Sequence, residues 1–228
     1  MVAHLRVALL LVAEHSAVHN FMVDIRIMAS PKRETNVKYI LNKLKMSDDI
    51  VIWDDRPNGG DAMYTARKAW LSPIDKDTTH RLVLQDDIDI CENFIENVEK
   101  IAKRNPDNIV SLINFLNPTN YPNKRGTPYY QVSVVPGCAI MMPSYMITNC
   151  MDWCDNYEDK SLAIHDDLMI SKFANTNEIK LVTILPCIVQ HCGAESLLST
   201  KYSWDRICKN YDPNPNVDWS IHSIQKVR

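Results

Sequence analysis

The feature that most constrains the fold is residues 80–94, HRLVLQDDIDICENF, where a short apolar run leads into carboxylates and then into a helical pattern. The run LVL is short enough to be a buried strand, and the apolar residues beyond the acids recur at three- and four-residue steps. Between them stand Asp86, Asp87 and Asp89. A strand that delivers acids at its C-terminal end, next to a helix start, is where open α/β sheets bind ligands.

The same succession of strand and helix runs along the chain. Strands are expected over 24–30, 50–53, 82–84, 109–113, 129–142, 179–185 and 188–191, and helices over 32–45, 61–71, 94–102, 143–156, 166–173 and 204–210. Strands separated by helices indicate βαβ units and an α/β fold. The ends of the first three strands would therefore meet at one edge of a sheet.

Composition excludes several classes of protein. The 228 residues carry a net charge of −3, which argues against a protein that binds its partners mainly by nonspecific attraction to phosphate. Five glycines form neither a dinucleotide-binding nor a P-loop fingerprint, so a phosphate has to be held by a metal ion and basic side chains. Seven scattered cysteines without a CxxC pair predict reduced thiols and a cytoplasmic protein, in the host cytoplasm if the chain is viral.

The N-terminal residues 1–21 are predicted to be an extension of uncertain status. Their apolar stretch at 5–13 is too short to span a bilayer and lacks a clear cleavage site, so no membrane association is expected. Residues 22–228 are expected to form a single domain, with one half at 22–113 and a second at 114–228. The loop expected at 114–128 is long for a compact domain, which favours a functional role.

The acids at residues 86–89 suit a hard cation. Residues two apart in an extended segment point the same way, so Asp87 and Asp89 are expected to present carboxylates to one point. Such a pair favours Mg²⁺ or Mn²⁺, which keep places for substrate phosphate oxygens. Acids are also common at helix starts, where the helix dipole favours them.

Six motifs in order resemble those of a GT-A glycosyltransferase, a nucleotide-sugar-dependent enzyme with a DxD motif. They are IRIMASPKR, IVIWDD, LVLQDDID, VVPGCAIMMP, IHDDLMISKF and VQHCG. The resemblance covers residues 24–199, and the small stand-alone enzymes of bacteriophages are the most similar type. It implies a Rossmann-like mixed central sheet flanked by helices, with residues 22–113 as the nucleotide-sugar half and 114–228 as the acceptor half.

The resemblance also implies roles for the residues that match these motifs. The metal ion, Mn²⁺ or Mg²⁺, would be held by Asp87, Asp89 and His191. The nucleotide diphosphate sugar, with UDP-sugars favoured, would contact Arg33, Asp54, Asp55, Asp86 and Asp87. The catalytic base would be Asp167 or Asp166, because an adjacent acid pair can raise one pKa toward neutrality.

Each of these residues also has a structural interpretation. Arg33 can be a solvated first-turn residue, and Asp55 can close a turn with the following residues. Asp166 can cap the helix that follows it. A single histidine at a strand end, such as His191, is often a buried hydrogen-bonded residue. Aromatic residues that could stack on an acceptor, and could equally pack in the core, are Tyr121, Tyr129, Tyr130 and Trp153.

Three functional hypotheses follow from the sequence. The first is a metal-dependent glycosyltransferase of the hexosyltransferase type, with a hydroxylated DNA base or a glycan as acceptor. The second is a nucleotidyltransferase or metal-dependent phosphoesterase, which also gathers acids at strand ends. The third is a non-catalytic nucleotide- or carbohydrate-binding module.

Overall fold

The structure is a computed structural model of the chain. It describes residues 22–56, 62–115, 127–159, 164–192, 207–221 and 223–226. The N-terminal extension, most of the loop expected at 114–128 and Tyr121 therefore lie outside the described residues.

The described strands form one large sheet and one small one. The eight-stranded sheet has the order β10 (Ile224–Lys226), β6 (Tyr129–Val132), β8 (Leu181–Ile184), β5 (Ile109–Ser111), β7 (Ala139–Pro143), β3 (Thr78–Gln85), β1 (Met22–Ala29) and β2 (Val51–Trp53). The second sheet pairs β4 (Ile88–Ile90) with β9 (Val189–His191).

Five α-helices and two short 3₁₀ helices connect these strands within the described residues. The α-helices are α1 (Glu34–Leu44), α2 (Ala62–Leu71), α3 (Phe94–Arg104), α4 (Ser144–Asn156) and α5 (Asp166–Thr176), and the 3₁₀ helices are η1 (Pro31–Arg33) and η2 (Asp48–Ile50). None of the helices in the described ranges has both the length and the apolar character that crossing a bilayer requires.

The large sheet is mixed. β1 pairs in parallel with both β2 and β3, whereas β7 is antiparallel to its neighbours β3 and β5. The fold is therefore α/β with a mixed sheet flanked by helices, as expected. The C-terminal ends of β1, β2 and β3 lie at one edge, and the reversed direction of β7 brings the start of that strand to the same edge.

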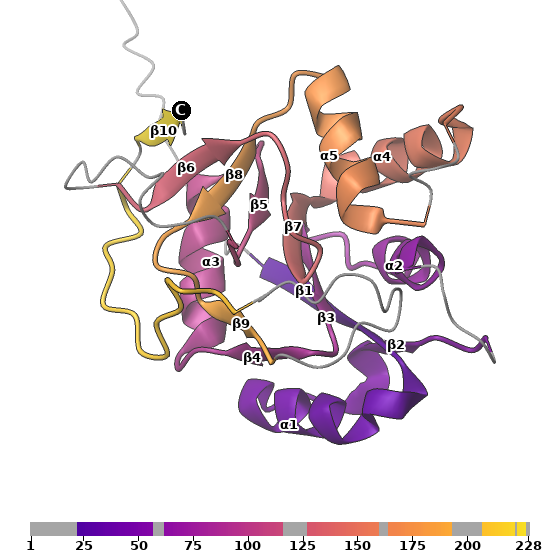
Figure 1. The fold of residues 1–228 in the computed structure, drawn as a ribbon, viewed down its shortest axis with the longest axis horizontal. Coiled ribbons are helices and arrows are strands. Elements are labelled where there is room, and N and C mark those ends of the chain that lie inside the picture. The colour runs from indigo at the N-terminus through magenta and orange to yellow at the C-terminus, as the bar shows by residue number, and fades with distance from the viewer. Residues whose placement is uncertain are drawn as a thin grey trace, which may run out of the picture.

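Side chains that alternate along the strands fill two cores, one on each face of the sheet. Leu82 and Leu84 of β3 join the core that contains α1, α3, β4 and β9, whereas Val83 joins the core that contains α2, α4 and α5. This alternation follows from the two-residue period of a strand. Figure 1 shows α2, α4 and α5 grouped together, with α1 and α3 apart from them.

Several details differ from the sequence expectations. The third strand is eight residues long, because the polar residues 78–81 continue the pairing of β1 with β3. The expected extended stretch at 129–142 is two strands, β6 and β7. The short pairs β4–β9 and β6–β10 join segments far apart in sequence, which local periodicity does not reveal. Of the helix expected at 204–210, residues 207–210 are described and are not helical.

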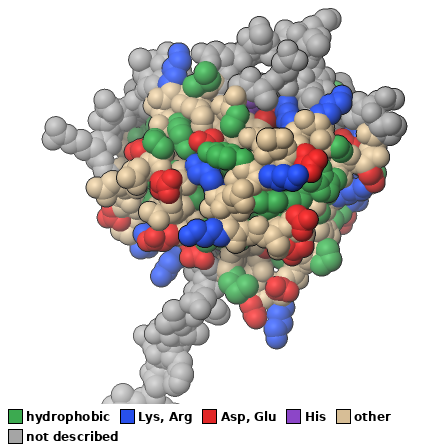
Figure 2. Space-filling view, turned by 90° about the horizontal axis from the view of Figure 1, so that it is seen from below, with side chains coloured by type: hydrophobic (Ala, Val, Ile, Leu, Met, Phe, Trp, Pro, Cys, Tyr) green, Lys and Arg blue, Asp and Glu red, His purple; other side chains and the backbone are tan. Residues whose placement is uncertain are grey.

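The surface of the described residues mixes charges of both signs. In the view from below, over the region of α1, Lys and Arg side chains lie among Asp and Glu side chains (Figure 2). This agrees with the small net charge of the chain.

Candidate metal and donor site

The ends of β1, β2 and β3 are joined by hydrogen bonds. The backbone N–H of Asp54, just past β2, donates to the carbonyl of Ala29 at the end of β1 at 2.7 Å. The next residue, Ser30, donates its backbone N–H to the Asp86 carboxylate, just past β3, at 2.6 Å. The parallel order of these strands therefore places the acids that follow β2 and β3 on either side of the loop after β1.

Arg33 bridges the two acids that follow β3. Its Nη1 donates to Asp86 Oδ1 at 2.8 Å and to Asp87 Oδ2 at 2.7 Å. All three side chains are largely buried, with 14% of the Arg33 side chain exposed and 6% and 5% of the two carboxylates. In the structure Arg33 is thus ion-paired with the two acids that follow β3, and its predicted contact with a nucleotide sugar remains a prediction.

Burial and charge act differently on the two acids. Burial raises the pKa of Asp86, and the Ser30 N–H and Arg33 offset only part of that effect. Burial also raises the pKa of Asp87, but the contact with His191 and the charge of Arg33 outweigh it and hold that pKa below its usual value. Of these two acids, Asp87 is therefore the one that remains charged more readily.

The small sheet brings His191 to Asp87. Ile88 of β4 is paired with His191 of β9, and the Cys192 N–H donates to the backbone carbonyl of Asp87 at 2.8 Å. His191 Nε2 lies 3.2 Å from Asp87 Oδ2, and both side chains are buried. The ring of Phe115 meets the His191 ring edge-on, with centroids 6.4 Å apart.

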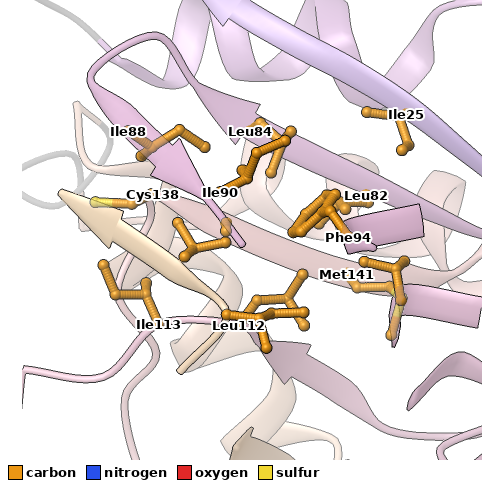
Figure 3. Close-up of a cluster of buried hydrophobic side chains, with 14 of the residues drawn as sticks. Ile25, Leu82, Leu84, Ile88, Ile90, Phe94, Leu112, Ile113, Cys138 and Met141 are labelled. Atoms are coloured by element: carbon orange, nitrogen blue, oxygen red, sulfur yellow. The ribbon is translucent and has the colours of Figure 1, made fainter. Parts of the chain in front are cut away.

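Cys138 completes a group of three side chains that could hold a metal ion, called the metal-binding group below. Asp87, Cys138 and His191 each offer one possible ligand atom, and these three atoms lie within 4.8 Å of one another. All three residues are buried. Figure 3 shows Cys138 among the apolar side chains of β3, β4 and the β5 end. Asp87 Oδ1 is buried and has no hydrogen-bond partner among the described residues. Because a buried carboxylate oxygen without a partner is costly, this group fits a bound cation.

Asp89 is not part of this group in the structure. The chain bends at residues 86–87 before β4 begins at Ile88, so the two-residue alternation of a strand does not hold across the bend. The Asp89 carboxylate accepts from Lys43 Nζ at 2.8 Å and from Tyr39 OH at 3.0 Å, both on α1. The structure therefore gives Asp89 partners on α1, and its predicted place beside Asp87 at a metal ion remains a prediction.

The acids after β2 are paired with basic residues. Asp54 accepts from Nε and Nη2 of Arg56 at 2.9 and 2.8 Å, which helps to lower its pKa despite partial burial. Asp55 accepts from Lys68 Nζ at 2.8 Å, on α2. Both acids stand at the expected edge, and their predicted contacts with a nucleotide remain predictions.

The second acid pair lies beside the first site. A Cβ added to Gly137 would stand 3.2 Å from Asp166 Oδ1 and 3.2 Å from Asp167 Cβ. Since Gly137 directly precedes Cys138, the start of β7 places the acids of α5 next to the metal-binding group. His165 is the N-cap residue of α5, so the two acids stand in the first turn of the helix and Asp166 does not occupy the N-cap position.

Asp167 is suited to proton transfer. Burial raises the pKa of its carboxyl, and hydrogen bonds from the N–H groups of Leu168 and Gly137 only partly oppose this. Its Oδ1 accepts from the Leu168 N–H at 2.8 Å. A raised carboxyl pKa brings a general base closer to neutral pH.

A pocket of about 510 Å³ opens onto the acids of β3. Its lining side chains come from η1, α1, the bend after β3 and the end of β9; they are Lys32, Arg33, Thr35, Asn36, Tyr39, Asp86, Asp87 and Cys192. Asn36 also fixes the bend, because its amide donates to the backbone carbonyls of Asp86 and Ile88. The pocket lining thus includes both positive charges, from Lys32 and Arg33, and negative charges, from Asp86 and Asp87.

The described aromatic candidates have structural partners. Tyr129 is buried and donates its hydroxyl to the carbonyl of Trp219 at 2.8 Å. Trp153 stacks on Tyr157 with ring centroids 4.6 Å apart. Tyr130 is also buried. These residues therefore pack against other parts of the protein, which is the alternative to stacking on an acceptor.

The comparisons with known proteins give little beyond the fold. No protein-family model matches the chain, and no curated protein sequence matches it. Among solved structures, the chain is similar to one titled "Crystal Structure of A197 from STIV". The two chains are 15% identical, the match covers 86% of this chain and 98% of that one, and the TM-score is 0.47. The comparisons therefore identify no family. The structure itself shows a mixed α/β fold with a group of side chains at one edge of the sheet that could hold a metal ion.

Proposed function

We propose that the protein is a metal-dependent glycosyltransferase that moves a sugar from a nucleotide diphosphate sugar to an acceptor hydroxyl. The observation that carries this proposal is that Gly137, which packs against Asp166 and Asp167, directly precedes Cys138, which is grouped with Asp87 and His191. One set, Asp87 with His191, is suited to a cation, and the other, Asp166 with Asp167, is suited to proton transfer. Sugar transfer from such a donor needs both functions at one place.

Asp87 and His191 would hold the divalent ion, which when bound stabilises negative charge on the leaving diphosphate. Arg33 and Lys32 line the adjoining pocket, and their positive charges suit a diphosphate. Arg33 balances Asp86 and Asp87 in the structure. A cation bound to Asp87 would neutralise part of the negative charge that Arg33 neutralises in the structure. Arg33 could then also form an ion pair with the phosphates of the donor.

Asp167 would act as the general base. Its carboxylate would take the proton of the acceptor hydroxyl as the new glycosidic bond forms, and inversion at the sugar carbon is the expected outcome. The burial that raises its pKa favours this role. Asp166 stands beside it in the first turn of α5 and would be the alternative base.

The test is a screen of UDP-, GDP- and CMP-sugars with Mn²⁺ or Mg²⁺, followed by transfer trials with glycans and hydroxymethylated DNA. The proposal expects metal-dependent release of UDP or GDP from its sugar, and transfer to one acceptor class; a CMP-sugar, which carries a single phosphate, should not react. No hydrolysis and no transfer with any donor would overturn it.

A nucleotidyltransferase is the second candidate, favoured by the carboxylates that follow β2 and β3 at one edge of the sheet and by those at the start of α5. That activity would release pyrophosphate from a nucleoside triphosphate without sugar transfer. Incubation with nucleoside triphosphates beside the nucleotide sugars separates the two, because analysis of the products distinguishes pyrophosphate from a nucleotide diphosphate.

A further inference from the structure

We propose that Cys138 is a metal ligand, and that the site it forms with Asp87 and His191 binds a borderline ion such as Zn²⁺ in preference to Mg²⁺. The sequence motifs point to carboxylates and a histidine, which alone suit Mg²⁺ or Mn²⁺. A thiol changes the chemistry of the site, because thiolate ligands select softer ions and Mg²⁺ prefers oxygen.

The geometry supports a three-ligand site. Donor atoms of the three residues lie within 4.8 Å of one another, and tetrahedral zinc ligands stand about 3.4–3.8 Å apart given the usual bond lengths. Asp87 Oδ2 and His191 Nε2 are already 3.2 Å apart. Small side-chain adjustments would therefore bring all three donors to an ion.

The backbone around Cys138 is fixed. Its carbonyl accepts from the Gln85 N–H at 2.9 Å, and the strand β7 begins at the next residue, Ala139. On the other side, the close packing of Gly137 against Asp166 and Asp167 limits movement. Cys138 is 3% exposed, so its thiol faces the protein interior and the site, not bulk water.

Charge also favours a divalent ion with a thiolate. The ion-paired cluster that contains Asp87 also holds Asp86 and Arg33, and the formal charges of the three side chains sum to −1. A divalent ion that displaces the thiol proton of Cys138 to solvent adds a net charge of +1. The site would then be neutral, whereas a divalent ion without the thiolate would leave a buried excess of positive charge.

The pocket of about 510 Å³ gives an ion access, because Asp87 lies in its wall. Three protein ligands leave one position of a tetrahedral ion open, which is the pattern of a catalytic zinc site. The inference rests on the proposed function only in assigning that open position to a donor phosphate oxygen. Binding of the ion itself needs no nucleotide.

The test is Co²⁺ binding followed by absorption, in the absence of nucleotide. A thiolate ligand gives a charge-transfer band in the near ultraviolet, and the wild-type protein should show it. Cys138→Ser should remove the band and weaken Zn²⁺ binding by on the order of 100-fold. The matched control is Cys192→Ser, because Cys192 lines the same pocket and lies outside the three-residue group, so its loss should leave the band.

No band in the wild-type protein, or a band that survives Cys138→Ser or vanishes in Cys192→Ser, would overturn the inference. If Cys138→Ser fails to fold, calorimetry of Zn²⁺ binding to the wild type in buffers of different ionisation enthalpy decides. Release of about one proton per ion near pH 7 supports a thiol ligand, and release of none contradicts it. UDP binding that depends on Mg²⁺ without any thiolate band would reject this inference and leave the proposed function standing.

Discussion

Among single residues, Asp167 carries the clearest assignment of a chemical role, because burial raises its pKa while it stands next to the metal-binding group. Asp167→Asn removes the base and keeps the shape and the hydrogen bond from Leu168. Transfer should fall by about 10²-fold or more, with nucleotide affinity nearly unchanged, because the base acts on the acceptor proton in the transition state. Steady-state kinetics and calorimetric titration with the donor nucleotide measure the two effects.

Asp166→Asn is the comparison for that variant. The two acids are adjacent in α5, and Asp166 is the more deeply buried of the two. If Asp166→Asn lost transfer and Asp167→Asn kept it, the roles would be exchanged. If Asp167→Asn instead lost donor affinity and kept turnover at saturation, the assignment of a base to Asp167 would be wrong.

Asp89 provides a second prediction at the scale of the residue. Its carboxylate is held by Lys43 and Tyr39 and is absent from the three-residue group. Asp89→Asn should therefore leave metal affinity within about twofold and cost about 1 kcal/mol of stability or less, the usual range for a partly exposed ion pair. Metal titration and urea denaturation check both values. Loss of metal binding in Asp89→Asn would contradict this prediction and show that Asp89 contributes to the metal site.

At the level of elements, β3 is tied to the end of α2 by a buried arginine. Arg81 Nη1 donates to the carbonyls of Ala69, Trp70 and Ser72, and its Nε donates to Asp24 at 2.6 Å. These carbonyls belong to the C-terminal end of α2 and to the turn after it. Carbonyls at a helix C-terminus have no N–H partner within the helix. Arg81 therefore caps the helix and anchors it to the central sheet.

Arg81→Met should cost about 3–5 kcal/mol of unfolding free energy, because it removes the arginine donor from several carbonyls and leaves the Asp24 carboxylate with Arg26 as its remaining arginine partner. Arg26→Met is the matched control. Arg26 also contacts Asp24 and the carbonyl of Pro73 but is more exposed, so its loss should cost about 1 kcal/mol. Urea denaturation of both variants gives the comparison, and equal losses would contradict the capping role.

The elements that sequence predicts well are those with a local signal. The strand-then-acid pattern at residues 80–94 predicts both β3 and the edge at which its acids lie, because the period of the apolar residues changes there. The bend at residues 86–87 has no such signal, and the alternation argument for Asp89 fails at it. Cys138 was not predicted as a ligand, because its position depends on the antiparallel pairing of β7 with β3 and on the β4–β9 pair. Its neighbour Gly137, in the motif VVPGCAIMMP, is the one local hint.

For the whole molecule, stability should depend on pH through a buried histidine. His80 is 1% exposed, and its Nε2 donates to the carbonyl of Asn105 at 3.2 Å. Burial lowers its pKa, and the Asn105 carbonyl and the charge of Asp107 offset only part of that effect. The unfolded chain therefore binds a proton more readily than the folded protein, below the ordinary histidine pKa of about 6.5.

The sign follows from that difference. The stability contribution of neutral His80 is complete above about pH 6.5 and is lost as pH falls below it, by at most about 1.4 kcal/mol per pH unit. Urea denaturation between pH 7.5 and 5 measures this. His80→Gln, which keeps a donor for Asn105 and does not titrate, should show a shallower decline. Identical pH dependence of the two proteins would contradict the prediction.

The central claim is that one edge of the sheet binds a nucleotide diphosphate through a cation on Asp87. Calorimetric titration with UDP, with and without Mn²⁺, Mg²⁺ or Zn²⁺, tests it most directly. We expect binding only with a divalent ion, abolished by Asp87→Asn and kept by Asp107→Asn, whose residue precedes β5 at the opposite edge. Binding that needs no metal ion and survives Asp87→Asn, or no binding under any condition, would contradict the claim.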